Sequence, residues 1–181
     1  MQKIISLFQR NYEGDHLVRD EVVPGAEWVV AGEGRATRKW DGTCAMVRDG
    51  VLYKRYDQKP GRKAPEGWEP AQEPDPGTGH HPGWLRIGDG PEDQWFREGI
   101  FEDEMADGTY ELVGPKIGGN PEGFQKHFFI LHGDDTRDVP RDFAGIKAWL
   151  ADRDIEGIVW HHPDGRMVKI KAKDFGLKRG A

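Results

Sequence analysis

The segment Glu156-Gly157-Ile158-Val159-Trp160, followed by Asp164-Gly165 and then by Lys169-Ile170-Lys171, predicts two antiparallel strands joined by a tight turn. Both runs contain β-branched or aromatic residues, and Asp-Gly is a common pair in two-residue hairpin turns. We therefore expect an α+β fold dominated by antiparallel strands.

The register of these two strands decides which side chains lie together. A two-residue turn at the Asp-Gly pair sets Trp160 opposite Lys169 and Ile158 opposite Lys171. Glu156 shares the face of Ile158 and Trp160, because side chains alternate along a strand. This register places Glu156 and both lysines on one surface, whereas a three-residue loop would reverse the parity. The alternative interpretation is an ordinary salt bridge on a solvent face.

Two further motifs precede this hairpin. Lys39-Trp40-Asp41-Gly42 lies early in the chain, and Tyr110-Glu111-Leu112-Val113-Gly114 lies near its middle. Alone, the first motif is also typical of a surface turn, because Asp-Gly favours turns. The order of all the motifs along one chain is what indicates a function.

Taken in order, these motifs resemble motifs I, III, IV and V of the covalent nucleotidyltransferases, which are the ATP-dependent nucleic-acid ligases and the mRNA-capping enzymes. Over most of the chain, the sequence also resembles the vertebrate 5′-phosphate/3′-hydroxyl RNA ligases. The segments that carry this second resemblance are Lys39-Trp40-Asp41-Gly42-Thr43-Cys44, Tyr56-Asp57-Gln58-Lys59-Pro60, His81-Pro82-Gly83-Trp84, Gly118-Gly119-Asn120-Pro121 and Glu156-Gly157-Ile158-Val159-Trp160-His161.

The resemblance implies the nucleotidyltransferase fold, in which two antiparallel sheets flank the ATP site. We expect residues 1–181 to form a single domain of this kind. Because the chain ends ten residues after Lys171, we expect no appended C-terminal domain.

The resemblance also implies that Lys39 attacks the α-phosphate of the co-substrate ATP to form Lys39-AMP. The attack requires the neutral amine, and nearby cations favour that form. Arg38 is adjacent in sequence, and Arg55 would contact ribose or phosphate. Mg²⁺ or Mn²⁺ would add the largest local charge. Asp41 and Gly42 would shape the turn that presents the amine.

Four other residues receive roles from the resemblance. Glu111 would bind the ribose hydroxyls. Glu156 would help to hold the metal, since a hard carboxylate suits magnesium. Lys169 and Lys171 would neutralise the α-phosphate and the charge that develops on the leaving pyrophosphate.

The adenine-stacking aromatic residue should fall within residues 127–130, where Phe128 and Phe129 are both candidates. Many ligases carry a glutamate directly before the nucleophilic lysine, and this chain has Arg38 there. That difference concerns the contact with the base and the choice of nucleotide.

Residues 44–56 predict a hairpin with a type I′ turn at Asp49-Gly50. Its register sets Arg48 opposite Val51 and Cys44 opposite Arg55, which would return Arg55 to the neighbourhood of Lys39. Residues 57–95 are rich in proline, glycine and tryptophan and predict a long, loop-rich insertion. Trp68, Trp84 and Trp95 should either anchor it or, alternatively, stack on RNA bases.

Two short strands and one helix complete the predicted elements. The strands cover residues 109–113 and 127–132. The helix begins with Pro140 at its first position and directs apolar residues toward the core. These are Phe143, Ile146 and Leu150.

Composition limits the classes of protein that fit. The formal net charge of −6 argues against indiscriminate binding to nucleic acid, although a local basic groove is compatible with it. For RNA we expect contacts from Lys59, Arg62, Lys63 and Lys173. No apolar run reaches membrane-spanning length, and the first residues do not form a signal peptide, so we expect a cytoplasmic protein.

Cysteine and histidine residues predict no zinc site. Cys44 is the single cysteine and fits a packed strand residue in a reducing compartment. His80-His81 and His161-His162 are adjacent pairs whose side chains diverge on a strand. His127 and His132 are more typical of structural or nucleic-acid contacts than of metal ligands.

The predicted function is that of an ATP-dependent RNA ligase acting on RNA with 5′-phosphate and 3′-hydroxyl ends. One alternative keeps the same chemistry, as a minimal DNA nick ligase or a GTP-dependent capping guanylyltransferase. Another is an inactive nucleotide-binding or RNA-binding module. The sequence does not indicate an oligomeric state.

Overall fold

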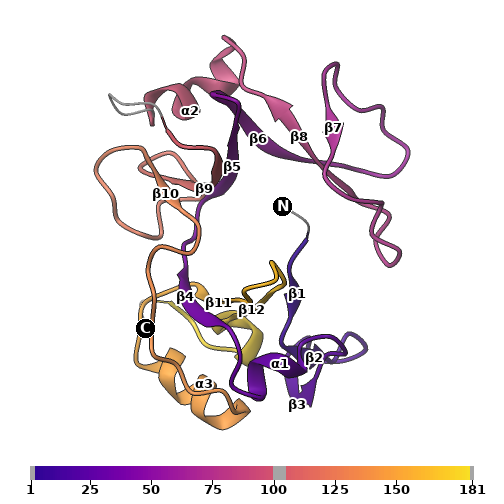
Figure 1. The fold of residues 1–181 in the computed structure, drawn as a ribbon, viewed down its shortest axis with the longest axis vertical. Coiled ribbons are helices and arrows are strands. Elements are labelled where there is room, and N and C mark those ends of the chain that lie inside the picture. Colours follow the sequence, from indigo (N-terminus) through magenta and orange to yellow (C-terminus); the bar gives the residue numbers. More distant parts are fainter. Residues whose placement is uncertain (1–2, 100–104, 180–181) are drawn as a thin grey trace. The chain divides into compact units, whose positions relative to one another are not determined.

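The structure is a computed structural model that describes residues 3–99 and 105–179. It falls into two compact units, which are described separately (Figure 1). The six-stranded unit contains the described residues of Asp41–His132, together with Lys3. The four-stranded unit contains the described residues of Ile4–Trp40 and Gly133–Ala181.

The four-stranded unit is named for a sheet in the order β1-β12-β11-β4. β1 runs parallel to β12, and the other pairs are antiparallel. A small β2-β3 pair and three helical segments complete the unit. The bounds are β1 Ile5–Ser6, β2 Phe8–Arg10, β3 Val18–Val22, α1 Glu27–Val30, β4 Arg35–Lys39, α3 Phe143–Ala151, β11 Gly157–His161, β12 Met167–Lys171 and the 3₁₀ helix η2 Ala172–Phe175.

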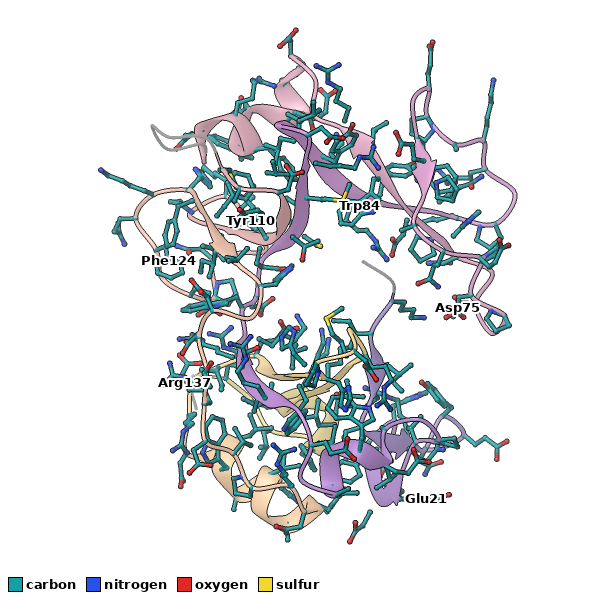
Figure 2. The ribbon with its side chains drawn as sticks, in the orientation of Figure 1. Glu21, Asp75, Trp84, Tyr110, Phe124 and Arg137 are labelled. Atoms are coloured by element: carbon teal, nitrogen blue, oxygen red, sulfur yellow. The ribbon has the colours of Figure 1, made fainter. Side chains whose placement is uncertain are left out.

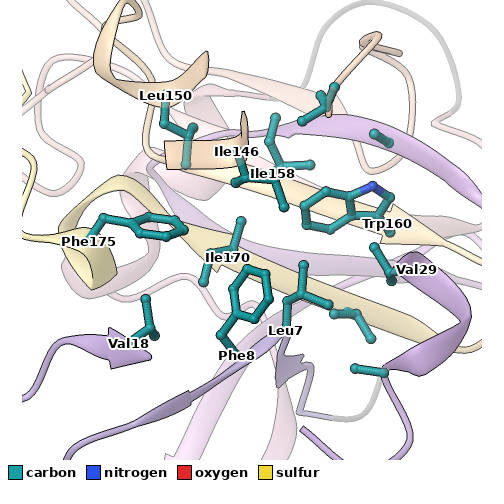
Figure 3. Packing of buried hydrophobic residues seen from close by; sticks show 14 of the residues in the cluster. Leu7, Phe8, Val18, Val29, Ile146, Leu150, Ile158, Trp160, Ile170 and Phe175 are labelled. Atoms are coloured by element: carbon teal, nitrogen blue, oxygen red, sulfur yellow. The ribbon is translucent and has the colours of Figure 1, made fainter. Parts of the chain in front are cut away.

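One face of this sheet carries the core of the unit (Figure 3). Ile158 and Trp160 from β11 are fully buried, as is Ile170 from β12. Helix α3 adds Ile146 and Leu150 to the same cluster. Because these strand residues point into the core, the residues between them point to the opposite face.

The register of β11 and β12 corrects the sequence prediction. Val159 pairs with Lys169, and Gly157 pairs with Lys171, so the parity is the reverse of the predicted one. The loop has three residues, 163–165, because the backbone N–H of His162 donates to the carbonyl of Arg166 at 2.9 Å. A two-residue loop would make Pro163 a ladder donor, which proline cannot be.

The six-stranded unit is named for an antiparallel sheet in the order β10-β9-β5-β6-β8-β7. One face of this sheet contributes Ala45 and Leu112 to a second core, and Phe96 and Ile117 pack against them. Figure 2 shows Tyr110 on β9 and Trp84 on β8. The bounds are β5 Thr43–Arg48, β6 Val51–Gln58, β7 Glu69–Pro70, β8 His81–Arg86, η1 Pro91–Asp93, α2 Gln94–Glu98, β9 Gly108–Val113 and β10 Phe128–Leu131.

The predicted hairpin is confirmed at its turn. Arg48 pairs with Val51, and Asp49 and Gly50 have φ angles of 52° and 71°, as a type I′ turn requires. The register extends outward through Ala45 and Lys54.

The prediction of a loop-rich insertion over residues 57–95 was wrong in part. β8 pairs with β6 over six residue pairs, although Pro82 and Gly83 ordinarily interrupt strands. The tryptophans anchor the segment as expected. Trp84 is 4% exposed, and the Nε1–H of Trp68 donates to the Tyr56 carbonyl at 3.0 Å. Trp95 stacks on His127 with ring centroids 4.8 Å apart.

Helix α3 begins three residues later than predicted. Asp142 is the N-cap, and its carboxylate accepts the backbone N–H of Gly145 at 2.8 Å. Pro140 therefore precedes the cap instead of opening the helix. Both units together form a mixed fold in which strands outweigh helices, which agrees with the predicted α+β class. No helix among residues 3–99 and 105–179 is long and apolar enough to cross a membrane.

We predict that Asp142→Ala lowers the free energy of unfolding by about 1 kcal/mol, because the N-cap hydrogen bond is lost. Asp138→Ala is the matched control, since it removes the same charge from an exposed position outside the helix. Urea unfolding of both variants measures the difference. Equal losses in the two variants would contradict the assigned cap.

Candidate active site

In the four-stranded unit, Glu156 joins two lysines from different strands. Its Oε2 lies 2.5 Å from the Nζ of Lys39, and its Oε1 lies 2.5 Å from the Nζ of Lys171. All three side chains are mostly buried, with 11% of Glu156 exposed. The two oxygens of one carboxylate thus hold two separate ammonium groups.

The sheet register explains why these side chains meet. Gly157 pairs with Lys39 on one side and with Lys171 on the other, so both lysines flank a residue without a side chain. A Cβ at Gly157 would lie 2.1 Å from the Ile170 carbonyl oxygen, so only glycine permits this approach. Glu156 directly precedes β11, and strand alternation therefore does not fix its direction. The predicted meeting of Glu156 with Lys171 occurs, although the predicted register was wrong.

Lys169 lies on the same sheet face as Lys171, two residues before it on β12. It pairs with Val159, which itself pairs with Thr37. Burial, together with the positive charges of Lys171 and Lys39, lowers the pKa of Lys169 to about 8. Desolvation is the largest cause of this shift, because a charged amine loses hydration when it is buried.

The pKa of Glu156 is lowered as well, which for a carboxyl group favours the charged form. Burial alone would raise its pKa, but the charges and hydrogen bonds of Lys39 and Lys171 outweigh this effect and lower it. The carboxylate is therefore ionised at neutral pH. The cluster holds ammonium groups against one such carboxylate, which leaves an excess of positive charge suited to an anionic ligand.

Asp174 supports this cluster and was missed by the sequence analysis. Its Oδ2 accepts the backbone N–H of Lys171 at 2.9 Å, and its Oδ1 is paired with Arg10. Asp174 is 3% exposed. A single acid in a basic terminal segment carries no sequence signal of this role. Lys173, predicted to contact RNA, is exposed on η2.

Arg38 takes a different direction from the neighbouring Lys39. It pairs with Ile158, a residue of the core face, and its guanidinium lies 3.7 Å from the centre of the Trp40 ring. Its backbone N–H donates to the carbonyl of Asp135 at 2.8 Å.

In the six-stranded unit, two carboxylates bind the backbone that follows Trp40. The N–H of Gly42 donates to Glu111 at 3.2 Å, and the N–H of Asp41 donates to Glu122 at 3.1 Å. A Cβ at Gly42 would lie 2.2 Å from the Leu112 carbonyl oxygen, so a glycine is needed there. Glu122 was not predicted, because it lies far along the chain in a loop.

Glu111 is buried and bound on both sides. Its second oxygen lies 2.9 Å from the Nε2 of His132, and Cys44 sits directly opposite it on β5. His132 was predicted only as a structural or nucleic-acid contact. Its place beside Glu111 follows from the pairing of β9 with the end of β10, which the sequence alone did not fix.

The register separates the two candidate aromatic residues. Phe128 pairs with Val113 and so shares the sheet face of Glu111, where its ring meets Phe124 edge-on at 4.7 Å. Phe129 pairs with Leu112 and packs into the core of this unit. Phe128 is thus the aromatic residue on the face of Glu111.

The remaining predicted residues lie along β6 and the turn that follows it. The Nε of Arg55 is 3.0 Å from Asp57, and its guanidinium lies 5.3 Å from the centre of the Trp84 ring. Lys59, Arg62 and Lys63 are all exposed. The predicted approach of Arg55 to Lys39 involves both units and stays a prediction.

Comparison with known proteins adds an independent line of evidence. A family model described as RNA ligase 1 matches residues 98–180, which include Glu111, Glu156, Lys169 and Lys171. RNA ligase 1 of Mus musculus is 30% identical over 161 positions, and that of Rattus norvegicus is 28% identical over the same length. Each match covers 64% of this chain and 49% of the relative.

RNA ligase 1 of Danio rerio is 34% identical over 85 positions, which cover 41% of this chain and 26% of that protein. The chain spans about half the length of the two rodent relatives that it matches. The matches agree with the resemblance that the motifs indicated, and the sequence is similar to the RNA ligase 1 family.

Proposed function

We propose that this chain is an ATP-dependent RNA ligase that works through a covalent lysyl-AMP intermediate. One observation carries the proposal: Glu156 and three lysines, Lys39, Lys169 and Lys171, form one buried charged cluster built on three adjacent strands. The similarity to RNA ligase 1 proteins supports the choice of substrate.

In the first step, the Nζ of Lys39 attacks the α-phosphorus of ATP. A P–N bond forms, the bond to pyrophosphate breaks, and the activated nucleotide is kept as Lys39-AMP. Lys169 and Lys171 neutralise the charge that grows on the phosphates. Phe128 stacks on adenine, and Glu111 accepts hydrogen bonds from the ribose hydroxyls. Because the attack requires the neutral amine, Lys39 gives up a proton and its ion pair with Glu156 before the P–N bond forms.

The carboxylate of Glu156 fits a magnesium or manganese ligand. Its lowered pKa keeps it ionised at neutral pH, which suits a hard cation better than it suits a proton acceptor. Mg²⁺ commonly binds one or two carboxylates and completes its shell with phosphate oxygens and water. The metal, when bound, would offset the negative charge of the triphosphate.

The later steps use RNA ends. AMP passes from Lys39 to a 5′-phosphate, which creates a 5′-to-5′ pyrophosphate. A 3′-hydroxyl then attacks that phosphate, joins the strands and releases AMP. The exposed cations Lys59, Arg62, Lys63 and Lys173 would contact the phosphate backbone.

A binding module without catalysis explains the cluster less well. Burying ammonium groups together costs stability, as the lowered pKa of Lys169 indicates. A site that only bound nucleotide would have no need of a buried ion pair between Lys39 and Glu156. The cost is understandable if the charges serve phosphoryl transfer.

We predict that Lys39→Arg abolishes the labelled protein formed from ATP and magnesium. A guanidinium stays protonated and cannot attack, although it can still pair with Glu156 and preserve the fold. Labelled ATP followed by denaturing electrophoresis measures the adduct. Lys147→Arg, on the exposed side of α3, is the control that should retain it. An undiminished adduct in Lys39→Arg would remove Lys39 from the mechanism.

Lys169→Met should stabilise the protein while impairing adenylylation. The folded pKa of about 8 lies below the ordinary 10.5, so the cost of burying the charge is full below pH 8 and fades toward pH 10.5. We expect a gain of about 1 kcal/mol at pH 7, after allowance for solvent screening, and a smaller gain at pH 10. Thermal unfolding at both pH values, with Lys147→Met as control, measures this. A destabilised variant at pH 7 would contradict the assigned burial cost.

Substrate choice distinguishes the ligase from its alternatives. We predict that single-stranded RNA with a 5′-phosphate and a 3′-hydroxyl is joined efficiently, and that joining falls steeply as salt rises. Matching single-stranded DNA and a nicked DNA duplex should react poorly, since contacts with the 2′-hydroxyl favour RNA. Efficient sealing of the nick with little joining of RNA would point to a DNA ligase. Labelling by GTP in place of ATP would point to a capping enzyme.

A further inference from the structure

Three different metal-binding side chains meet on one face of the six-stranded sheet. They are Cys44, Glu111 and His132, and one donor atom from each lies within 4.8 Å of the other two. Glu111 is only 8% exposed. A thiol, a carboxylate and an imidazole are together a ligand set typical of zinc.

The sheet brings these residues together through its pairing. Cys44 on β5 is directly opposite Glu111 on β9, and directly paired side chains share a face. The backbone N–H of His132 donates to the Thr109 carbonyl at 3.0 Å, which sets His132 one step from Glu111 on the same face. Ligands on paired strands are held more firmly than ligands on a loop.

Neighbouring groups already orient two of the ligands. The Nδ1 of His132 lies 2.9 Å from the hydroxyl of Thr109, which leaves its Nε2 directed at Glu111. The other oxygen of Glu111 accepts the N–H of Gly42. Such outer contacts fix the ring orientation and the tautomer of a metal-binding histidine.

We propose that Cys44, Glu111 and His132 bind a divalent transition metal of the zinc type. The thiolate excludes magnesium as the preferred ion and favours Zn²⁺ or Co²⁺. Tetrahedral coordination needs ligand atoms about 3.5 Å apart, so the donors move slightly together on binding. The thiol of Cys44 gives up its proton to solvent. The proton on Nε2 of His132 is replaced by one on Nδ1, where the hydroxyl oxygen of Thr109 accepts it, and water takes the fourth position.

A metal in this site would weaken the binding of ATP, a consequence that rests on the proposed function. Glu111 is the residue assigned to the ribose hydroxyls, and it cannot serve the metal and the ribose together. Metal binding and ATP binding therefore weaken each other by the same factor. Zinc would act as an inhibitor of adenylylation through Glu111.

Cobalt titration of the reduced 181-residue chain without ATP tests the site. We expect a thiolate-to-cobalt charge-transfer band in the near ultraviolet, which must come from Cys44 because it is the single cysteine. Cys44→Ser should abolish the band, and His132→Asn should weaken binding at least tenfold. His162→Asn, which alters a histidine paired with Glu33 and Asp164, is the control that should leave binding unchanged.

Absence of the charge-transfer band in the wild-type protein would overturn the metal site. Loss of binding in His162→Asn with full binding in His132→Asn would overturn it equally. Repeating the titration with ATP tests the competition, and unchanged cobalt affinity would refute it. Because the first titration contains no nucleotide, it stands or fails independently of the ligase function.

Discussion

The charged cluster depends on the Glu156 carboxylate, which binds Lys39 and Lys171 at the same time. Without it, ammonium groups from β4 and β12, the two strands on either side of β11, would face one another in a poorly hydrated site. The geometry needs a glycine between the two lysines, and Gly157 supplies it. The cluster also explains why the pKa of Lys169 is lowered, since this amine is buried and lies near the charges of Lys171 and Lys39. The buried lysines thus lower the stability of the fold, whereas the proposed reaction requires them.

The sequence predicted elements well where the local signal is strong. The Asp49-Gly50 turn gave the correct register, because both residues tolerate positive φ angles. The predicted parity of the second hairpin was wrong because Pro163 belongs to the loop together with Asp164 and Gly165. The missing N–H of Pro163 pushes the residue into the loop and shifts every pair by one. The predicted start of α3 at Pro140 was also wrong. The helix begins after Asp142, because the Asp142 side chain caps its first turn.

Contacts between distant residues were the part that the sequence could not supply. Glu122, Asp174 and His132 each hold a motif residue, yet each is a single polar residue without a distinguishing pattern. The choice between Phe128 and Phe129 required strand parity, which only the pairing of β9 with β10 provides. Motifs therefore indicate candidate reacting groups, and the register identifies the residues that contact them.

In the proposed mechanism, Lys39 is the residue that carries AMP. Peptide mapping by mass spectrometry, after brief incubation of the protein with ATP and magnesium, tests it most directly. We predict AMP on the peptide that contains Lys39, with Lys169 and Lys171 unmodified. AMP on either of those two lysines, or joining of RNA without any AMP bound to the protein, would contradict it.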